Sequence, residues 1–226
     1  MIICNFPILD EFIKLSPRAT LLQIEDMRIY SQVVCSIYQR ENGLQPTYPF
    51  LLVDENFKAI AEPITIHHPL LFDLNSVTLK KKLFQRIVLM LDLDEKLEIE
   101  RIYNELTQYL NHKILENLEI PMEMSESCKL EDIFKLLKIT ISDSSASIFE
   151  KSQLILSLLK EFSIPNLIIF VGLGSLITQE EFHFMIEAVN LNQQQVLFLE
   201  NRPLESLKNI KHIHLDSDFV SWEKML

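Results

Sequence analysis

The sequence predicts an α/β fold in which a mainly parallel sheet carries an inserted α-helical domain. Residues 166–200 have the order strand, tight loop, helix, strand, and residues 20–43 repeat the strand-to-helix order. Residues 74–162 show only the 3.6-residue period of helices. Buried strands joined by one helix pair in parallel, so both ends of the chain are expected to enter one sheet.

The best-defined stretch is the strand–loop–helix–strand unit. Leu167–Val171 is an apolar run typical of a strand covered on both faces, and Gly172 and Gly174 predict a tight turn. Thr178 and Glu181 have the spacing of a helix-capping box. The helix is expected to bury one apolar face and to lead into a second buried strand; these positions are Phe182, Met185, Ile186, Val189 and Val196–Leu199.

The N-terminal part predicts two strands and a helix. Ile2–Ile8 and Thr20–Ile24 are strand-like, Glu25-Asp26 predicts a helix start, and Asn42-Gly43 predicts its end. Residues 44–70 contain four prolines, which favour extended segments and turns.

The middle of the chain predicts four helices with a break at Pro121. The first is capped by Asn75 or Ser76, the second runs from about Asp94 to Asn117, and the third contains Leu130–Leu137. Asp143 or Ser144 is expected to cap the fourth.

Two domains follow from this order of elements. Residues 73–162 are predicted to form an α-helical leg domain, and residues 1–72 and 163–226 a discontinuous α/β head. Within the head, a strand is expected at Ile210–Leu215, followed by a polar tail that contains Trp222.

Composition limits the functional classes. The chain has 226 residues, 48% of them hydrophobic, which is ample for a packed core. No apolar run is long enough to span a bilayer, no signal peptide is apparent, and three scattered cysteines indicate reduced thiols, so a cytoplasmic location is expected. The net charge of −11 argues against nucleic acid, but residues 73–162 hold 12 of the 21 basic residues.

The glycine loop at 172–177 lies where phosphate-binding loops occur. It lacks the third glycine of the dinucleotide fingerprint, because Ile177 stands there, and no Gly-Lys-Ser/Thr follows as in a P-loop. A plain tight turn is the simpler interpretation.

A second candidate is a metal site on the strand with His212, His214 and Asp216. The period of two puts these side chains on one face, at a spacing that suits zinc or manganese. The alternative is an edge strand whose polar face is solvated.

A third candidate is an acidic group near the break at Pro121, which would suit calcium because this ion takes six to eight oxygen ligands. A solvated surface is the alternative. The residues are Glu116, Glu119, Glu123 and Glu126.

Basic residues in the insertion are the candidates for contact with a phosphate backbone. Three consecutive lysines cannot share one helix face, so part of the set is expected to be solubilising. The set is Lys80, Lys81, Lys82, Arg86, Lys129, Lys135 and Lys138.

Three stretches make the chain similar to a known family: Leu21–Gln39, Ser147–Lys151 and Asn166–Arg202. In these stretches it resembles the small adaptation protein of type II-A CRISPR systems, which is non-catalytic, forms rings and binds double-stranded DNA ends. The resemblance implies a head related to P-loop ATPases without a working nucleotide site, and a helical leg domain. It also implies a homotetramer around duplex DNA that supports spacer acquisition.

The resemblance further implies partners and a cofactor. The partners are the integrase pair and the RNA-guided nuclease of the same system, and calcium is expected at the acidic segment from Glu116 to Glu126. Two alternatives stay open: a metal-dependent hydrolase or nuclease that uses His212, His214 and Asp216, and a divergent nucleotide-binding ATPase.

Overall fold

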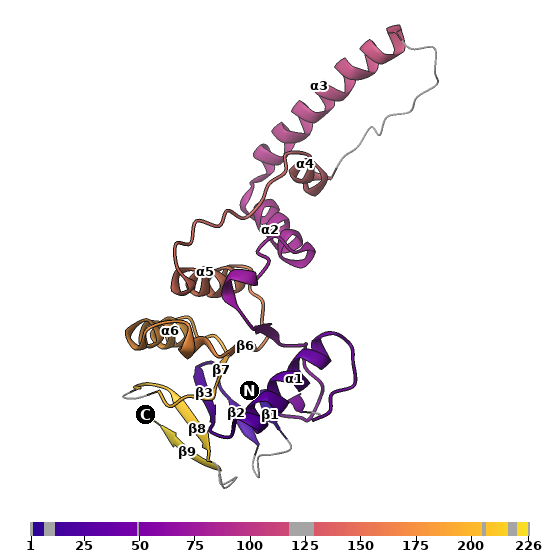
Figure 1. Cartoon of the computed structure of the whole chain (residues 1–226). Coiled ribbons are helices and arrows are strands. Elements are labelled where there is room, and N and C mark those ends of the chain that lie inside the picture. The colour runs from indigo at the N-terminus through magenta and orange to yellow at the C-terminus, as the bar shows by residue number, and fades with distance from the viewer. Residues whose placement is uncertain are drawn as a thin grey trace. The chain divides into compact units, whose positions relative to one another are not determined.

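The computed structural model describes residues 2–6, 12–48, 50–117, 129–204, 207–216 and 221–225. The chain divides into two compact units (Figure 1). Residues 1–72 and 144–226 form the first, called the sheet unit, and residues 73–143 form the second, called the helical unit.

A six-stranded sheet is the centre of the sheet unit, with the strand order β5-β6-β7-β3-β8-β9. All neighbours pair in parallel except β8 and β9, which are antiparallel. The mainly parallel α/β fold is therefore confirmed. The strands are β3 (Ala19–Ile24), β5 (Ile64–Ile66), β6 (Ile168–Val171), β7 (Val196–Glu200), β8 (Lys211–Leu215) and β9 (Ser221–Met225).

The predicted strand–loop–helix–strand unit is present. Strand β6 leads through a short 3-10 turn, η2 (Leu173–Ser175), into helix α6 (Gln179–Leu191), and β6 then pairs with β7 in parallel. Thr178 and Glu181 form the expected capping box, which typically stabilises a helix by about 1 kcal/mol. The four predicted apolar positions of α6 are all buried.

Helix α1 (Met27–Glu41) follows β3, as the N-terminal pattern predicts. The Asp26 carboxylate caps it by accepting hydrogen bonds from the backbone amides of Arg28 and Ile29, at 2.8 and 3.0 Å. Because side chains alternate along a strand, β3 and β7 bury two faces. Helix α1 covers the face of Leu22 and Leu197, and α6 covers the opposite face through a contact of Phe182 with Phe198 (Figure 1).

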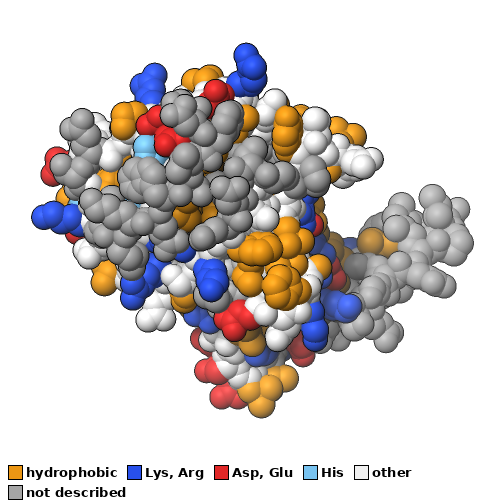
Figure 2. Space-filling view, turned by 90° about the horizontal axis from the view of Figure 1, so that it is seen from below, with side chains coloured by type: hydrophobic (Ala, Val, Ile, Leu, Met, Phe, Trp, Pro, Cys, Tyr) orange, Lys and Arg blue, Asp and Glu red, His pale blue; other side chains and the backbone are white. Residues whose placement is uncertain are grey.

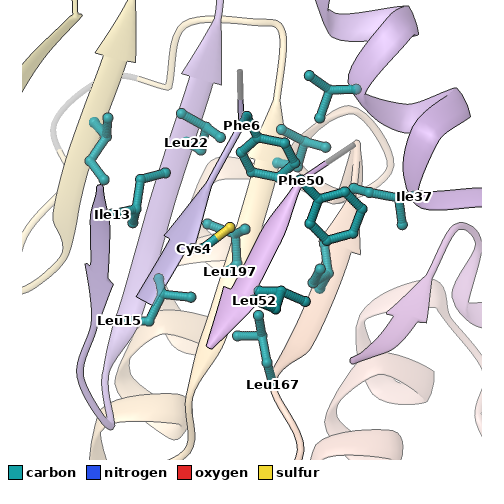
Figure 3. Close-up of a cluster of buried hydrophobic side chains, with 14 of the residues drawn as sticks. Cys4, Phe6, Ile13, Leu15, Leu22, Ile37, Phe50, Leu52, Leu167 and Leu197 are labelled. Atoms are coloured by element: carbon teal, nitrogen blue, oxygen red, sulfur yellow. The ribbon is translucent and has the colours of Figure 1, made fainter. Parts of the chain in front are cut away.

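A small antiparallel sheet of order β2-β1-β4 closes the core on the α1 side. Its strands are β1 (Ile2–Asn5), β2 (Ile13–Leu15) and β4 (Leu51–Asp54). Figure 3 shows Cys4, Leu15 and Leu52 from these strands gathered with Leu22 and Leu197 of the large sheet. Burial raises the pKa of the Cys4 thiol to about 12, so this cysteine stays a neutral core residue.

The helical unit contains α2 (Val77–Met90), α3 (Leu93–Asn117) and α4 (Leu130–Leu136). The three helices were predicted near these bounds. No helix within the described residues has the length and apolar character that crossing a membrane requires.

Helix α5 (Ile148–Glu161) belongs to the sheet unit, whereas the helical period of the sequence predicted it to lie in the leg domain. Its residues Ile155, Leu156 and Leu159 are buried, and the helix packs against α6 and the 3-10 turn η1 (Pro69–Leu71). Gln194 Nε2 also donates a hydrogen bond to the Leu156 carbonyl at 3.0 Å. Ser147 caps α5, so the predicted cap at Asp143 or Ser144 is wrong.

Two strands lie where none was predicted. Strand β9 occupies the expected polar tail, and its register places Trp222 opposite His214. The three residues of β2 are too few to show a period of two, and β9 alternates only weakly, so neither had a clear pattern in the sequence.

Candidate nucleic-acid interface

Helix α2 carries four of the seven predicted DNA-contacting residues. The Ser76 hydroxyl accepts a hydrogen bond from the Leu79 amide at 3.4 Å and so begins the helix. Positions 77, 80, 81, 84 and 85 recur at i, i+3, i+4, i+7 and i+8, so these side chains share one face. Lys82 and Arg86 lie outside this face.

Helix α4 packs against α2 through an aromatic pair. The ring centroids of Phe84 and Phe134 are 5.8 Å apart and both side chains are buried. Asn75 fixes the chain after α4, because its side chain donates to the Ile141 carbonyl at 3.0 Å and accepts from the Ile141 amide at 2.9 Å. These contacts hold α2, α4 and residues 139–141 together.

The C-terminus of α4 places Lys138 in the left-handed region, with φ of 54°. The Ile139 amide donates to the Phe134 carbonyl at 3.1 Å and the Lys138 amide to the Lys135 carbonyl at 3.0 Å, which is a Schellman motif. Glycine is the usual residue at this position, since a side chain costs about 1 kcal/mol there. Lys138 is thus held in a strained backbone conformation directly after α4.

Five of the seven predicted residues line one cavity of about 850 Å³ within the helical unit, here called the lysine cavity. Most of its exposed lining is apolar. The lining residues are Val77, Lys80, Lys81, Phe84, Gln85, Lys129, Glu131, Asp132, Lys135, Lys138, Ile139 and Thr140.

The charges around the lysine cavity are unequal, with five lysines against two acidic residues. One acid is engaged, because Lys135 Nζ lies 2.7 Å from Asp132 Oδ1. The Lys135 ammonium, with a smaller contribution from Lys129, holds the pKa of the Asp132 carboxyl below its ordinary value. A positive site is thus built in a chain whose net charge is −11.

Basic side chains are distributed differently elsewhere. On the face of the molecule drawn in Figure 2, Lys and Arg are scattered among apolar and acidic side chains. The lysine cavity differs from this face because α2 and α4 concentrate like charges around one hollow.

The other residues of the lysine cavity were not predicted from the sequence. Val77, Phe84 and Gln85 share the helix face of Lys80 and Lys81, and this face could have been found by reading the lysines with a period of 3.6 rather than as a consecutive run. No sequence pattern could have identified Ile139 and Thr140 as lining residues. Their segment reaches α2 through the hydrogen bonds between Asn75 and Ile141, which are distant in the sequence.

The predicted calcium ligands fall largely outside the described residues. Glu119, Glu123 and Glu126 lie in the segment 118–128, and Glu116 belongs to the last turn of α3 with its side chain likewise outside the description. Within the part of the chain that the structure describes, no group of three or more His, Cys, Asp or Glu side chains could hold a metal ion.

His212 and His214 lie on one face of β8, as predicted, with ring centroids 5.9 Å apart. Their partners are polar side chains at the end of β3 rather than a third ligand. His212 Nε2 lies 3.1 Å from Gln23 Oε1, and His214 Nε2 lies 2.8 Å from Glu25 Oε1. With Asp216, they make no cluster that could hold a metal among the described residues.

The glycine loop after β6 is occupied by a side chain of the protein itself. Glu200, fully buried at the end of β7, accepts a hydrogen bond from the Gly174 amide at 2.8 Å. A Cβ on Gly174 would meet Leu204 Cδ2 at 3.1 Å and Glu200 Oε2 at 3.2 Å, so the loop has no room beside this amide. An amide that a phosphate loop offers to its ligand is thus already used by a carboxylate.

Comparison with known proteins identifies the family. The model of the family described as CRISPR-associated protein (Cas_Csn2) matches residues 48–219. A CRISPR-associated protein Csn2 of Streptococcus agalactiae is 34% identical over 213 residues, which cover 92% of each chain. The chain belongs to the Csn2 family.

A second relative agrees with this assignment, and a solved structure is similar in fold. A Csn2 protein of Enterococcus faecalis is 27% identical over 234 residues and covers 97% of this chain and 98% of its own. The crystal structure of Stu0660 of Streptococcus thermophilus is similar in fold, with a TM-score of 0.63 over 95% of this chain and 75% of that chain, at 12% identity.

Proposed function

We propose that this Csn2-family chain binds double-stranded DNA without sequence preference, through the lysines of its helical unit. The observation that carries the proposal is the lysine cavity, where Lys80, Lys81, Lys129, Lys135 and Lys138 converge. Lysine is a point charge without the planar fork of arginine, and this suits phosphates better than base edges. Lys82 and Arg86 of α2 add charge outside the cavity.

The assembly that we propose is a ring-shaped homotetramer that threads the ends of linear duplex DNA and supports spacer acquisition in the cytoplasm. Its partners would be the integrase pair and the RNA-guided nuclease of the same CRISPR system. The role is non-catalytic. Support for this role comes from family membership, and from the two histidines of β8, whose partners are Gln23 and Glu25.

The head is proposed to be a relative of P-loop ATPases that no longer binds nucleotide. The parallel sheet and the glycine loop fit this origin, and Glu200 supplies a physical reason for the loss. Its carboxyl group already accepts from the loop amide and, with Leu204, fills the space beside it, so a phosphate would find the same place taken.

Electrophoretic mobility shift assays on linear and closed circular duplexes of equal length test the ring. A ring that loads over an end is expected to bind the linear form at low salt and to leave the closed circle unshifted. Equal affinity for the two forms would rule out loading over ends.

Calcium is proposed to stabilise the assembly through the segment that contains Glu116, Glu119, Glu123 and Glu126. Removing calcium with a chelator should lower both the molar mass measured by light scattering and the affinity for linear duplex. Restored calcium should reverse both losses, whereas magnesium should not, because it prefers a smaller octahedral site that retains water. A chelated protein with unchanged mass and affinity would contradict calcium binding.

A further inference from the structure

The lysine cavity has a property that contact with a DNA backbone does not require. Phosphates are bound well by cations on an open surface, yet these cations surround a hollow with a largely apolar lining. Val77, Phe84 and Ile139 contribute this lining, on α2 and on the segment that Asn75 holds to it. Apolar walls with a few polar groups are typical of a site for a small molecule.

We propose that the lysine cavity binds a single nucleotide, with the base against the apolar wall and the phosphate at the lysines. Many anions with an apolar part would suit such a cavity. The choice of a nucleotide among them rests on the proposed DNA binding. The proposal goes beyond DNA binding, because contacts along a duplex backbone do not place a single nucleotide in a pocket.

The size and the wall chemistry fit this ligand. The volume of about 850 Å³ lies within the range of roughly 300–1,000 Å³ that small-molecule sites occupy. The base would lie against the apolar wall of Val77, Phe84 and Ile139, in which Phe84, buried against Phe134, exposes only 5% of its surface. The Gln85 amide and the Thr140 hydroxyl, also in the lining, can donate to and accept from a base edge.

The charges favour a phosphate. Among the described residues, no ion pair engages the side chains of Lys80, Lys81 or Lys138. Of the two carboxylates in the lining, that of Asp132 is bound to Lys135. An entering phosphate would therefore meet an excess of ammonium groups.

The same chemistry has two sources, a free nucleotide and the terminal nucleotide of a DNA strand. Isothermal titration calorimetry of the full-length protein with deoxyadenosine monophosphate at low salt tests the shared site. Deoxyadenosine and inorganic phosphate, titrated separately, should each bind at least about tenfold more weakly, because each makes only part of the contacts. A protein that does not bind the monophosphate overturns the proposal.

A steric variant tests the place of binding. Val77 is 87% exposed, so Val77→Trp should fold normally while its ring fills the apolar side of the cavity. It should weaken binding of deoxyadenosine monophosphate by about tenfold or more. Leu89→Trp is the control, on the same helix and 76% exposed but outside the cavity, and should bind as the wild type does. Equal affinity of the two variants would contradict the assignment.

A charge variant separates the cavity from general electrostatic attraction. Lys81→Glu and Lys82→Glu change the same charge on adjacent residues, but only Lys81 lines the cavity. Binding of deoxyadenosine monophosphate should fall about tenfold in Lys81→Glu and less than about twofold in Lys82→Glu. Equal losses would show attraction by net charge alone and would overturn the proposal.

A final comparison identifies the source. If the terminal nucleotide enters the cavity, a duplex with a one-nucleotide 5′-phosphorylated overhang should bind more tightly than a blunt duplex, and Val77→Trp should remove this preference. Equal binding of the two duplexes, with the monophosphate still bound, assigns the cavity to free nucleotide. Failure of the DNA proposal is distinguishable, because neither duplex would then bind the wild type at low salt.

Discussion

Glu200 is a fully buried carboxylate whose surroundings favour the protonated form. Burial raises its pKa to about 7, and the hydrogen bonds from the amides of Gly174 and Leu173 offset only part of this effect. The charge of Glu200 contributes in turn to raising the pKa of Tyr30 to about 12, although burial of the phenol has the larger effect. The glycine loop is thus built around a side chain whose ionisation is costly.

This shift predicts how the stability depends on pH. The unfolded Glu200 titrates near its ordinary pKa of 4.5, so between that value and about 7 only the folded state holds the proton. The stabilisation from this group is complete below pH 4.5 and is lost as the pH rises through 7. In Glu200→Gln the amide oxygen still accepts from Gly174 but does not ionise.

Urea unfolding of both proteins from pH 5 to pH 8 checks the prediction. Relative to the wild type, Glu200→Gln should become more stable as the pH rises, by about 1 kcal/mol or more at pH 8. Other carboxylates cancel in the difference between the two proteins. A difference that stays constant across this range would show that Glu200 titrates normally.

At the scale of helices, the starts were easier to predict from the sequence than the ends. Asp26, Ser76 and Thr178 cap α1, α2 and α6 as expected, because a side-chain acceptor before an apolar face is visible in sequence. The ends of α4, α5 and α6 carry no glycine. The residues in the left-handed conformation at these ends are Lys138, Ser163 and Gln193. A glycine would mark such an end in the sequence, but the chain has only 3 glycines.

These helix ends give a matched pair of variants. Lys138→Gly should stabilise the protein by about 1 kcal/mol, because glycine removes the strain at φ of 54°, and should also weaken duplex binding. Ser163→Gly relieves similar strain at the end of α5, in the other unit, and should stabilise without any effect on binding. Thermal unfolding and fluorescence anisotropy with labelled duplex measure the two effects. Unchanged affinity of Lys138→Gly would remove this lysine from the interface.

The basic residues of the candidate site could be predicted from the sequence, but the cavity that they line could not. The residue set was found from charge alone, and five of its seven members share the lysine cavity. The cavity itself depends on contacts between distant positions, such as Phe84 with Phe134 and Asn75 with Ile141. Periodicity within one helix carries no information on such pairs, so the apolar wall of the cavity was not predictable.

At the scale of the whole molecule, the chain separates a packed sheet unit from a helical unit that carries the lysines. The predicted insertion began at the same residue, 73, but its far end was placed at 162 because α5 has the same helical period as the helices before it. Burial of α5 against α6 and η1 decides its unit, and this is a tertiary property. The net charge of −11 likewise concealed a positive site, because charge acts locally within a screening length of about 10 Å.

The most direct test of DNA binding by the lysine cavity is the salt dependence of affinity for a short linear duplex. The variant replaces Lys80, Lys81 and Lys138 by alanine, and the control replaces Lys14, Lys58 and Lys208 of the sheet unit. The log–log slope should become shallower by about 0.9 for each cavity lysine that contacts a phosphate, and should stay unchanged in the control. Equal slopes in the wild type and both variants would contradict DNA binding by the lysine cavity.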